Sequence, residues 1–348
     1  MKTIARRNLT ATAVGLVLIL AVTAPGAERE VELLQNGGFE QGTSAWSGQG
    51  GAELSDLEAR TGKRSVRLTA GQRVLFGTRL LEQGQLYRAD AWIKVRNASG
   101  ERKVAPLLVV EQQGSYSSAG NHDWERVSHL HKAARSGPVQ VCVICPEGMR
   151  GEVYADDLSF RPCEDPHLKA LDFEDGSTLG VVFYHEPRPI YRVVEGATPN
   201  GKRYLAMSPG TSAAYVLSQP VTRGDTEFDF TFKSEKTFRV SLGGAGFSLE
   251  MIPRLRIVQG EGGAVSMGTI NPGSWCRVRG VIHLDQHTLD LQVTDFDDPL
   301  GSFEKKDAQM RQEKLGVTNV WFNSADKGET CLDAIYIGPV RREYGPIH

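Results

Sequence analysis

An alternating run of apolar and polar side chains spans residues 86–95, Leu-Tyr-Arg-Ala-Asp-Ala-Trp-Ile-Lys-Val. As a strand, this run would turn alternate side chains to opposite faces. The side chains on the core face would be those of Tyr87, Ala89, Ala91 and Ile93. The side chains on the other face would be those of Arg88, Asp90, Trp92 and Lys94. The run therefore places a tryptophan among charged groups on a surface that a ligand can reach.

Such a surface suits a sugar. A pyranose ring has an apolar C–H face and a rim of hydroxyls, so it binds on a flat aromatic ring with polar partners at the edge. We predict that Trp92 stacks on a sugar and that Arg88 and Asp90 hydrogen-bond to it. The alternative is that Trp92 is covered by a loop.

The segment Gln112-Gln-Gly-Ser-Tyr-Ser117 offers a second aromatic residue. Here we predict that Tyr116 contacts sugar and that Gln112 hydrogen-bonds to it, unless Tyr116 belongs to a mobile loop. The other tryptophans lie at or within expected strands, where core packing is the better interpretation. They are Trp46, Trp124, Trp275 and Trp321.

Motifs for catalysis are weak. The 42 Asp and Glu residues make chance carboxylate pairs easy to find. No strand carries the Glu-x-Asp-x-x-Glu pattern, and neither Gly-x-Ser-x-Gly nor His-Glu-x-x-His occurs. His129 and His131 lie two apart, but a pair without a third ligand is a weak metal signal. The sequence therefore favours binding over catalysis.

The composition excludes some partners. The chain has 348 residues, with 40 basic and 42 acidic side chains and a net charge of −2. This balance gives no electrostatic reason to bind nucleic acid or an anionic membrane. Charged residues make up 24% and hydrophobic ones 40%, which is typical of globular proteins. The length predicts two domains.

The secondary-structure signal is nearly all strand. Residues 227–232 and 288–293 alternate with period two, and residues 107–110 form a short apolar run. We expect one short helix around 304–314. Clusters of Gly, Pro, Asn and Asp separate the runs. The pattern predicts an all-β fold of β-sandwich or jelly-roll type.

The first 27 residues have the pattern of a signal peptide. Lys2, Arg6 and Arg7 precede an apolar run over 11–24, and small residues follow it. An uncleaved signal anchor is the alternative. No later stretch is long and apolar enough to span a membrane. We therefore expect a secreted or periplasmic protein.

Five cysteines follow the expected signal peptide. Cys142 and Cys145 have the spacing of a redox or zinc motif, but they lie in a β-run that would turn them to opposite faces. Buried structural thiols are the favoured interpretation. A disulfide involving Cys163 is an alternative, and Cys276 could pair with Cys331.

Three sequence elements occur twice in the same order. A Phe-Glu pair opens each half, at Glu40 and at Glu174. A Gly-Lys-Arg segment and a strand follow at 62–68 and at 201–207. A final strand carries Asp156 in the first half and Asp333 in the second. The repeat predicts two domains, 28–163 and 164–348, with a polar linker near 161–169.

The first half resembles the carbohydrate-binding modules of families 4, 9 and 22. The resemblance covers residues 31–161 and rests on the opening Asn36-Gly-Gly-Phe-Glu40, the strand 62–68, the Tyr-x4-Trp-Ile-Lys strand ending at Lys94, Trp124-Glu-Arg-Val127 and the closing 153–157. It implies a galactose-binding-like jelly roll, a β-glucan, xylan or related ligand, and attachment to secreted glycoside hydrolases. The second half resembles concanavalin-like or laminin-G-like sandwiches.

The resemblance also implies a structural Ca²⁺ ion. Glu40 and Asp156 match the family's Phe-Glu and Asp-Asp elements, and backbone carbonyls around 60–63 would complete the oxygen ligands. The repeat extends the same expectation to Glu174 and Asp333. The alternative is that these carboxylates cap turns or face water.

Together these patterns predict two β-sandwich (jelly-roll) domains in tandem after a signal peptide. The expected function is non-catalytic binding of a polysaccharide or oligosaccharide, which assists separate glycoside hydrolases. One alternative is a divergent glycoside hydrolase or lyase with its active site in the second domain. Another is a structural or adhesion protein that binds no glycan.

Overall fold

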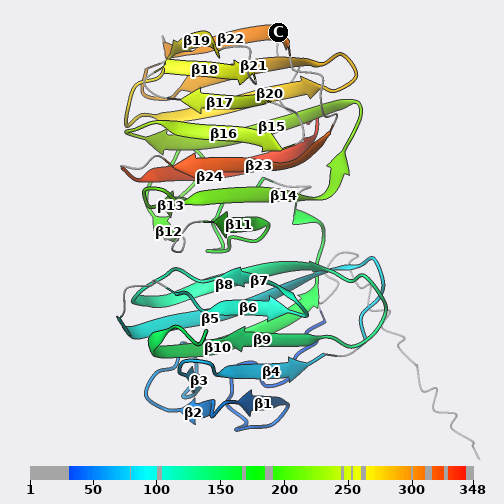
Figure 1. Cartoon of the computed structure of the whole chain (residues 1–348), viewed down its shortest axis with the longest axis vertical. Helices are drawn as coiled ribbons and strands as arrows, with labels where there is room; N and C mark the ends of the chain where they lie inside the picture. Colours follow the sequence, from blue (N-terminus) through cyan, green and yellow to red (C-terminus); the bar gives the residue numbers. More distant parts are fainter. Residues whose placement is uncertain are drawn as a thin grey trace, which may run out of the picture. The chain divides into compact units, whose positions relative to one another are not determined.

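The computed structural model describes residues 31–78, 80–99, 104–166, 170–184, 191–243, 247–251, 254–259, 264–298, 301–309, 316–324 and 328–341. The expected signal peptide, 1–27, lies outside these residues. The extended elements within them are antiparallel β-strands, as the sequence predicts (Figure 1). Among the described residues we find no helix with the length and apolarity that a membrane crossing requires.

The first half of the described chain folds into two five-stranded antiparallel sheets. One has the order β1-β4-β9-β6-β7 and the other β2-β3-β10-β5-β8. The strands are β1 (Trp46–Gln49), β2 (Glu53–Ser55), β3 (Ser65–Leu68), β4 (Arg73–Gly77), β5 (Leu86–Ser99), β6 (Leu107–Val110), β7 (Gln113–Tyr116), β8 (His122–Lys132), β9 (Gln140–Ile144) and β10 (Arg150–Pro162). Their facing sides enclose one hydrophobic core built from residues between 34 and 160.

The second half of the described chain forms two seven-stranded sheets, β11-β14-β23-β16-β17-β18-β19 and β12-β13-β24-β15-β20-β21-β22. The strands are β11 (Val181–Tyr184), β12 (Tyr191–Glu195), β13 (Arg203–Met207), β14 (Ser212–Val221), β15 (Asp225–Ser234), β16 (Phe238–Gly243), β17 (Phe247–Met251), β18 (Arg254–Gln259), β19 (Ala264–Thr269), β20 (Trp275–His283), β21 (Thr288–Asp295), β22 (Phe303–Gln309), β23 (Val317–Ser324) and β24 (Thr330–Pro339). Their core is a separate cluster of residues between 171 and 337.

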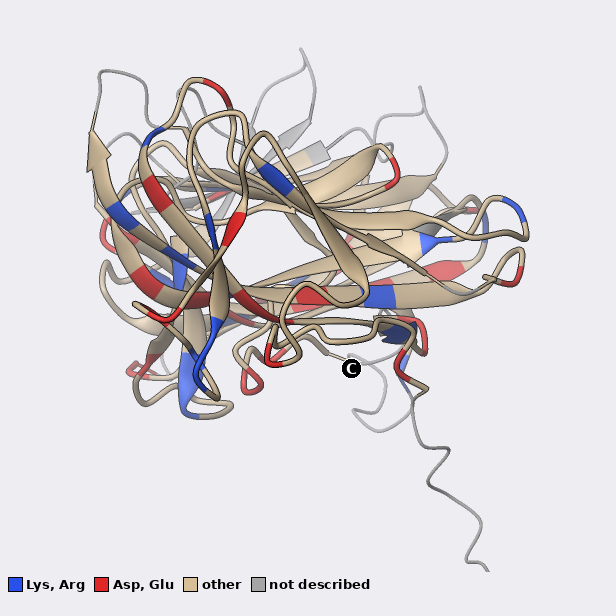
Figure 2. Ribbon diagram, turned by 90° about the horizontal axis from the view of Figure 1, so that it is seen from below, with Lys and Arg blue, Asp and Glu red and all other residues tan. Residues whose placement is uncertain are grey.

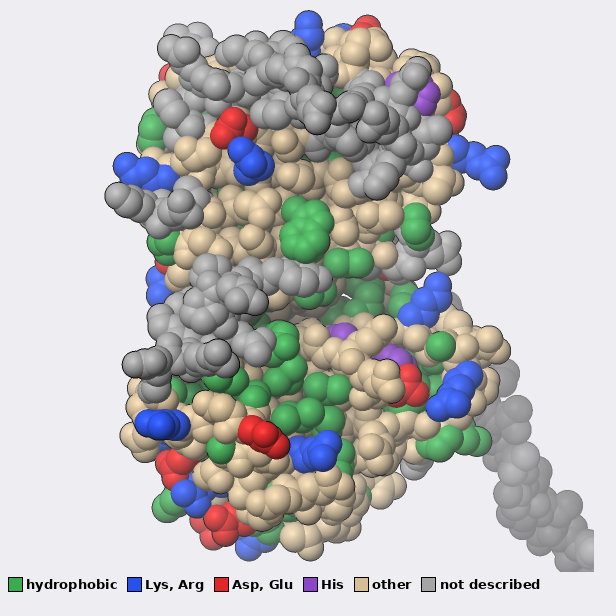
Figure 3. All heavy atoms as spheres, viewed as in Figure 1, with side chains coloured by type: hydrophobic (Ala, Val, Ile, Leu, Met, Phe, Trp, Pro, Cys, Tyr) green, Lys and Arg blue, Asp and Glu red, His purple; other side chains and the backbone are tan. Residues whose placement is uncertain are grey.

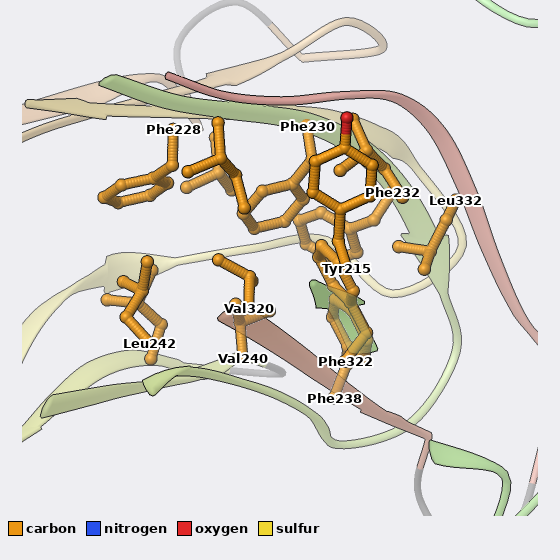
Figure 4. Packing of buried hydrophobic residues seen from close by; sticks show 14 of the residues in the cluster. Tyr215, Phe228, Phe230, Phe232, Phe238, Val240, Leu242, Val320, Phe322 and Leu332 are labelled. Atoms are coloured by element: carbon orange, nitrogen blue, oxygen red, sulfur yellow. The ribbon is translucent and has the colours of Figure 1, made fainter. Parts of the chain in front are cut away.

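Period-two alternation builds both cores. On β5, Tyr87, Ala89, Ala91 and Ile93 are buried in the first core, as predicted. On β15, Phe228, Phe230 and Phe232 are at most 1% exposed and pack with Tyr215 of β14 and Phe322 of β23 (Figure 4). Burying each such ring stabilises the fold by about 1.5–3 kcal/mol. The phenylalanines of this one strand therefore fix which face of β15 turns inward.

One structural expectation is wrong, and one disulfide that the sequence left open is excluded. Residues 304–309 of the expected helix at 304–314 belong to strand β22, which lies at a sheet edge and pairs with β21. Its exposed Glu-Lys-Lys run is typical of an edge strand, which leaves one side unpaired and carries charge. The rest of that stretch, 310–314, lies outside the described residues. Cys276 and Cys331 cannot pair, because they neighbour Phe232 and Lys233 and so lie on opposite faces of their sheet.

Core packing, which the sequence predicts for Trp46, Trp275 and Trp321, holds for Trp46 alone of these three. Trp46 packs on the first core, edge-on to Phe39 at 5.5 Å between ring centroids. Trp275 and Trp321 are only half-buried and lie outside the second core. Each neighbours a core residue along its strand, Cys276 or Phe322, so its own side chain lies on the outer face.

The described part of the chain carries both signs of charge in the view from below (Figure 2). Basic and acidic residues are interspersed over the strands and loops (Figure 2). In the space-filling view, hydrophobic side chains gather over the first sandwich (Figure 3).

Candidate functional site

A pocket of about 460 Å³ lies over β5 and β8, and residues of the second half close it. Trp92 of β5 and Trp124 of β8 both line it. Because Trp92 pairs with Arg126, and Trp124 lies two residues before Arg126, both indoles lie on the outer face of one sheet. The pocket therefore has two aromatic groups on adjacent strands.

Each indole lies near a basic side chain. The Arg60 guanidinium lies 3.5 Å from the centroid of the Trp92 ring, and Lys94 Nζ lies 6.0 Å from that of Trp124. A cation at the face of an aromatic ring is attracted by its π electrons. The Arg60 contact occupies one face of Trp92, so a ligand can stack only on the other face.

Glu125 supplies the pocket's most buried carboxyl group. Its Oε2 accepts a 3.0 Å hydrogen bond from the Ser118 backbone N–H, and the Ser118 hydroxyl donates to Oε1 at 3.2 Å. Burial raises the pKa of Glu125, although the nearby His122 and the Ser118 hydrogen bonds oppose the shift. Glu125, with its raised pKa, and the neighbouring His122 imidazole can each donate a hydrogen bond to a ligand hydroxyl or accept one from it.

Arg88 and Asp90 take part in an ionic network beside the pocket. Asp90 is 3% exposed. It accepts hydrogen bonds from Arg88 Nε at 2.8 Å, Arg126 Nη2 at 3.1 Å and the Ser128 hydroxyl at 2.5 Å. Burial alone would raise the pKa of Asp90, but Arg88 and Arg126 bring it below the ordinary value. Asp175, from the second half, pairs with Arg88 at 3.0 Å.

The two remaining predicted sugar contacts lie apart from Trp92. Tyr116 ends β7, and its backbone carbonyl accepts a 2.5 Å hydrogen bond from the Tyr191 hydroxyl, whose residue lines the pocket. Gln112 lies in the exposed turn before β7 and lines a different cavity. Of the five predicted sugar-contact residues, Trp92 is the one that lines this pocket.

Trp124 corrects an expectation of core packing, because it is half-buried and lines the pocket. The sequence held a signal for this. Val127 is buried in the core, so alternation along β8 would place Trp124 on the outer face with Arg126. No comparable sequence pattern points to His122 or Glu125 as pocket residues, because neither forms part of a motif.

The predicted calcium residues of the first half contact one loop. Glu40 Oε1 accepts 2.8 Å hydrogen bonds from the backbone N–H groups of Lys63 and Arg64. Asp156 is fully buried and accepts a backbone N–H bond from Arg60 at 2.8 Å. Burial raises the pKa of Asp156 to about 6, although backbone hydrogen bonds oppose it. A buried carboxylate whose charged form is disfavoured is suited to bind a cation.

The second half repeats this arrangement. Glu174 Oε1 accepts backbone N–H bonds from Lys202 at 2.7 Å and Arg203 at 2.8 Å. Asp333 is fully buried, and burial raises its pKa. A Cβ at Gly62 would lie 2.4 Å from the Glu40 carboxylate, and one at Gly201 would lie 2.2 Å from that of Glu174. A side chain at either glycine would displace the glutamate carboxylate, and at Gly62 the φ of 63° itself favours glycine.

The donor set partly fits Ca²⁺. Phe39 and Phe173, each just before the glutamate, share a left-handed backbone with φ of 58° and are fully buried. No cluster of three or more His, Cys, Asp or Glu side chains suits a metal in the described part of the chain. Each site therefore offers two carboxylates at most, and backbone carbonyls and water would supply the other oxygens.

The second sandwich contains a pair of acidic residues on the outer face of β15. Glu227 is fully buried, and its carboxylate accepts hydrogen bonds from Arg279 Nε at 3.2 Å and Arg341 Nη2 at 2.7 Å. Asp229 accepts from Arg277 Nε at 2.9 Å. Burial would raise the pKa of Glu227, but Arg341 brings it below the ordinary value. A glycosidase acid needs the opposite shift.

Comparison with known families finds a match within the first half. Residues 31–125 match a family model described as a carbohydrate binding domain. The matched stretch includes both pocket tryptophans and confirms the resemblance found in the sequence. None of the curated proteins matches the chain significantly.

Several solved structures are similar. The CBM22-1-CBM22-2 tandem of Xyn10C from Paenibacillus barcinonensis has 13% identity, covering 91% of this chain and 100% of that chain, with a TM-score of 0.31. TmCBM61 in complex with beta-1,4-galactotriose has 17% identity, 38% and 99% coverage and a TM-score of 0.28. Lectin I-B4 from Griffonia simplicifolia has 11% identity, 48% and 94% coverage and a TM-score of 0.31. At these TM-scores none of the three bears on the ligand of this chain.

Proposed function

We propose that the chain is a secreted, non-catalytic carbohydrate-binding protein that holds a glycan against Trp92 and Trp124. The observation that carries this proposal is the pair of indoles on adjacent strands at the wall of one pocket. The family match of residues 31–125 supports a glycan as the ligand. The signal-peptide pattern at 1–27 supports export, where the protein would assist separate glycoside hydrolases.

Capture is non-covalent. A sugar ring stacks its C–H face on Trp92 or on Trp124, and its hydroxyls hydrogen-bond to Glu125 and His122 at the pocket wall. Asp90 and Arg88 act behind this surface, because their polar groups already bind each other. Their contribution is to hold β5 and β8 in register beneath the tryptophans.

Replacing Trp92 or Trp124 by alanine is expected to weaken glycan binding about tenfold, because each loses one stacking surface. Polysaccharide pull-down followed by calorimetry with the retained glycan measures the change. Trp321→Ala is the matched control, a half-buried tryptophan on the second sandwich. Unchanged affinity in both pocket variants, with normal melting curves, would contradict the proposed site.

We also propose that Ca²⁺ binds at Glu40 and Asp156, and a second ion at Glu174 and Asp333, in a structural role. At a concentration one hundred times the Kd, one bound ion would stabilise the fold by about 2.7 kcal/mol. We expect chelator to lower the melting temperature, with Asp156→Asn and Asp333→Asn each removing part of the response. Because protons compete for Asp156, whose pKa is about 6, the response should shrink as the pH falls below that value. Equal melting curves with calcium and with chelator would exclude both ions.

A further inference from the structure

A second cavity, of about 860 Å³, lies within the first sandwich. It forms where the turn between β6 and β7 meets the end of β8 and the loop leading into β9. Neither Trp nor Tyr nor Phe contributes to its described lining, in contrast to the Trp92 pocket. Three glutamine residues line it instead, Gln112, Gln113 and Gln140. Its volume lies in the range of small-molecule sites.

His131 is the buried polar group of this cavity. Its side chain is 3% exposed, and neither ring nitrogen has a hydrogen-bond partner among the described residues. Burial lowers the pKa of His131, opposed only by the charge of Glu111, so the ring is neutral at pH 7. A neutral imidazole offers one donor and one acceptor. A ligand hydroxyl, which can donate and accept, would satisfy a ring nitrogen that is otherwise buried without a hydrogen bond.

The rim of the cavity is held in place and charged. Glu111 has a left-handed backbone with φ of 55°, unusual for a residue other than glycine, and its N–H donates to the Gln140 carbonyl at 3.0 Å. This bond ties the β6–β7 turn to the start of β9. Lys132 and Arg135 line the same cavity, are exposed, and form no ion pair with any described residue. The rim therefore carries two cations and one carboxylate.

We propose that this cavity binds a hexuronic acid, free or at the end of a glycan chain. Its hydroxyls bond to His131 and to the glutamine amides, and its carboxylate lies against Lys132 and Arg135. The site needs no stacking ring, because recognition comes from hydrogen bonds and charge. It is separate from the Trp92 pocket and independent of the function proposed there.

The test is an NMR titration of the chain without its expected signal peptide, with its histidine rings isotopically labelled. The His131 signal is assigned as the one that is missing from the His131→Gln variant. The probes are galacturonic acid, its trisaccharide, glucose and acetate. We expect the His131 signal to shift when galacturonic acid is added. Glucose should bind about tenfold more weakly, because it lacks the carboxylate that pairs with Lys132 and Arg135. Arg135→Ala should weaken the binding of galacturonic acid about tenfold. Arg150→Ala, an exposed arginine on β10, is the control.

Other results would overturn the inference. They are an unmoved His131 signal, equal affinity for glucose, saturation by acetate alone, or equal weakening by Arg150→Ala. Tighter binding of the trisaccharide than of the monosaccharide identifies a chain end as the ligand, and equal binding identifies the free acid. Trp92→Ala should leave this titration unchanged, so failure of the polysaccharide site and failure of this one are distinguishable.

Discussion

Replacing Asp90 by alanine is expected to lower the free energy of unfolding by about 3–5 kcal/mol. The carboxylate is 3% exposed and accepts hydrogen bonds from Arg88, Arg126 and Ser128. Its removal leaves two guanidinium groups in a partly buried place without their main counter-charge. Since burial of an unpaired charge is costly, the expected loss of stability exceeds the stabilisation that the ion pair itself contributes. Urea unfolding followed by circular dichroism measures it.

Glu53→Ala is the matched control in the same sheet. Glu53 pairs with Arg67 at 3.0 Å, but its side chain is 64% exposed, so its loss should cost less than about 1 kcal/mol. An Asp90 variant as stable as the Glu53 variant would refute the structural role. If that stable variant also lost glycan binding, the original prediction that Asp90 contacts sugar would hold instead.

Trp92 and Asp90 show what period-two alternation along a strand can predict and what it cannot. Period-two spacing on β5 correctly placed Tyr87, Ala89 and Ile93 in the core and the charged residues on the other face. It could not show what covers that face. Asp175 lies 87 positions after Arg88 and pairs with it, and no local pattern encodes so distant a contact. The same limit applies to His131, whose isolation depends on a turn and a loop from other parts of the chain.

The repeated elements allowed a more detailed prediction. The sequence shows a Phe-Glu pair followed by a Gly-Lys-Arg segment in each half, and in the structure each glutamate carboxylate accepts two backbone N–H bonds from that segment. Repetition is informative because a glycine lies next to a glutamate carboxylate in both halves. The outward tryptophans were harder to predict, since a large apolar side chain at a strand start is usually buried. Trp124 and Trp275 are exceptions.

Removing the carboxylate of Glu227 is expected to have the largest effect in the second sandwich. Glu227 is fully buried and accepts hydrogen bonds from Arg279, from the Arg341 side chain at 2.7 Å and from the Arg341 backbone N–H at 2.8 Å. Arg341 also contacts Tyr336, with its guanidinium carbon 3.9 Å from the ring centroid. Glu227→Ala should therefore detach the segment after β24 and cost about 3–5 kcal/mol. Urea unfolding measures it.

Glu250→Ala, which removes a half-exposed partner of Arg239 at 3.4 Å, provides the comparison and should cost under about 1 kcal/mol. Lowering the pH should reproduce part of the stability loss expected for Glu227→Ala. Since the folded pKa of Glu227 lies below its ordinary value of 4.5, its stabilisation is present above that pH and is lost as the pH falls through the folded pKa. A catalytic Glu227 would behave differently. Its variant would stay stable and lose reducing-sugar release, and that pair of results would revive the hydrolase alternative for the second sandwich.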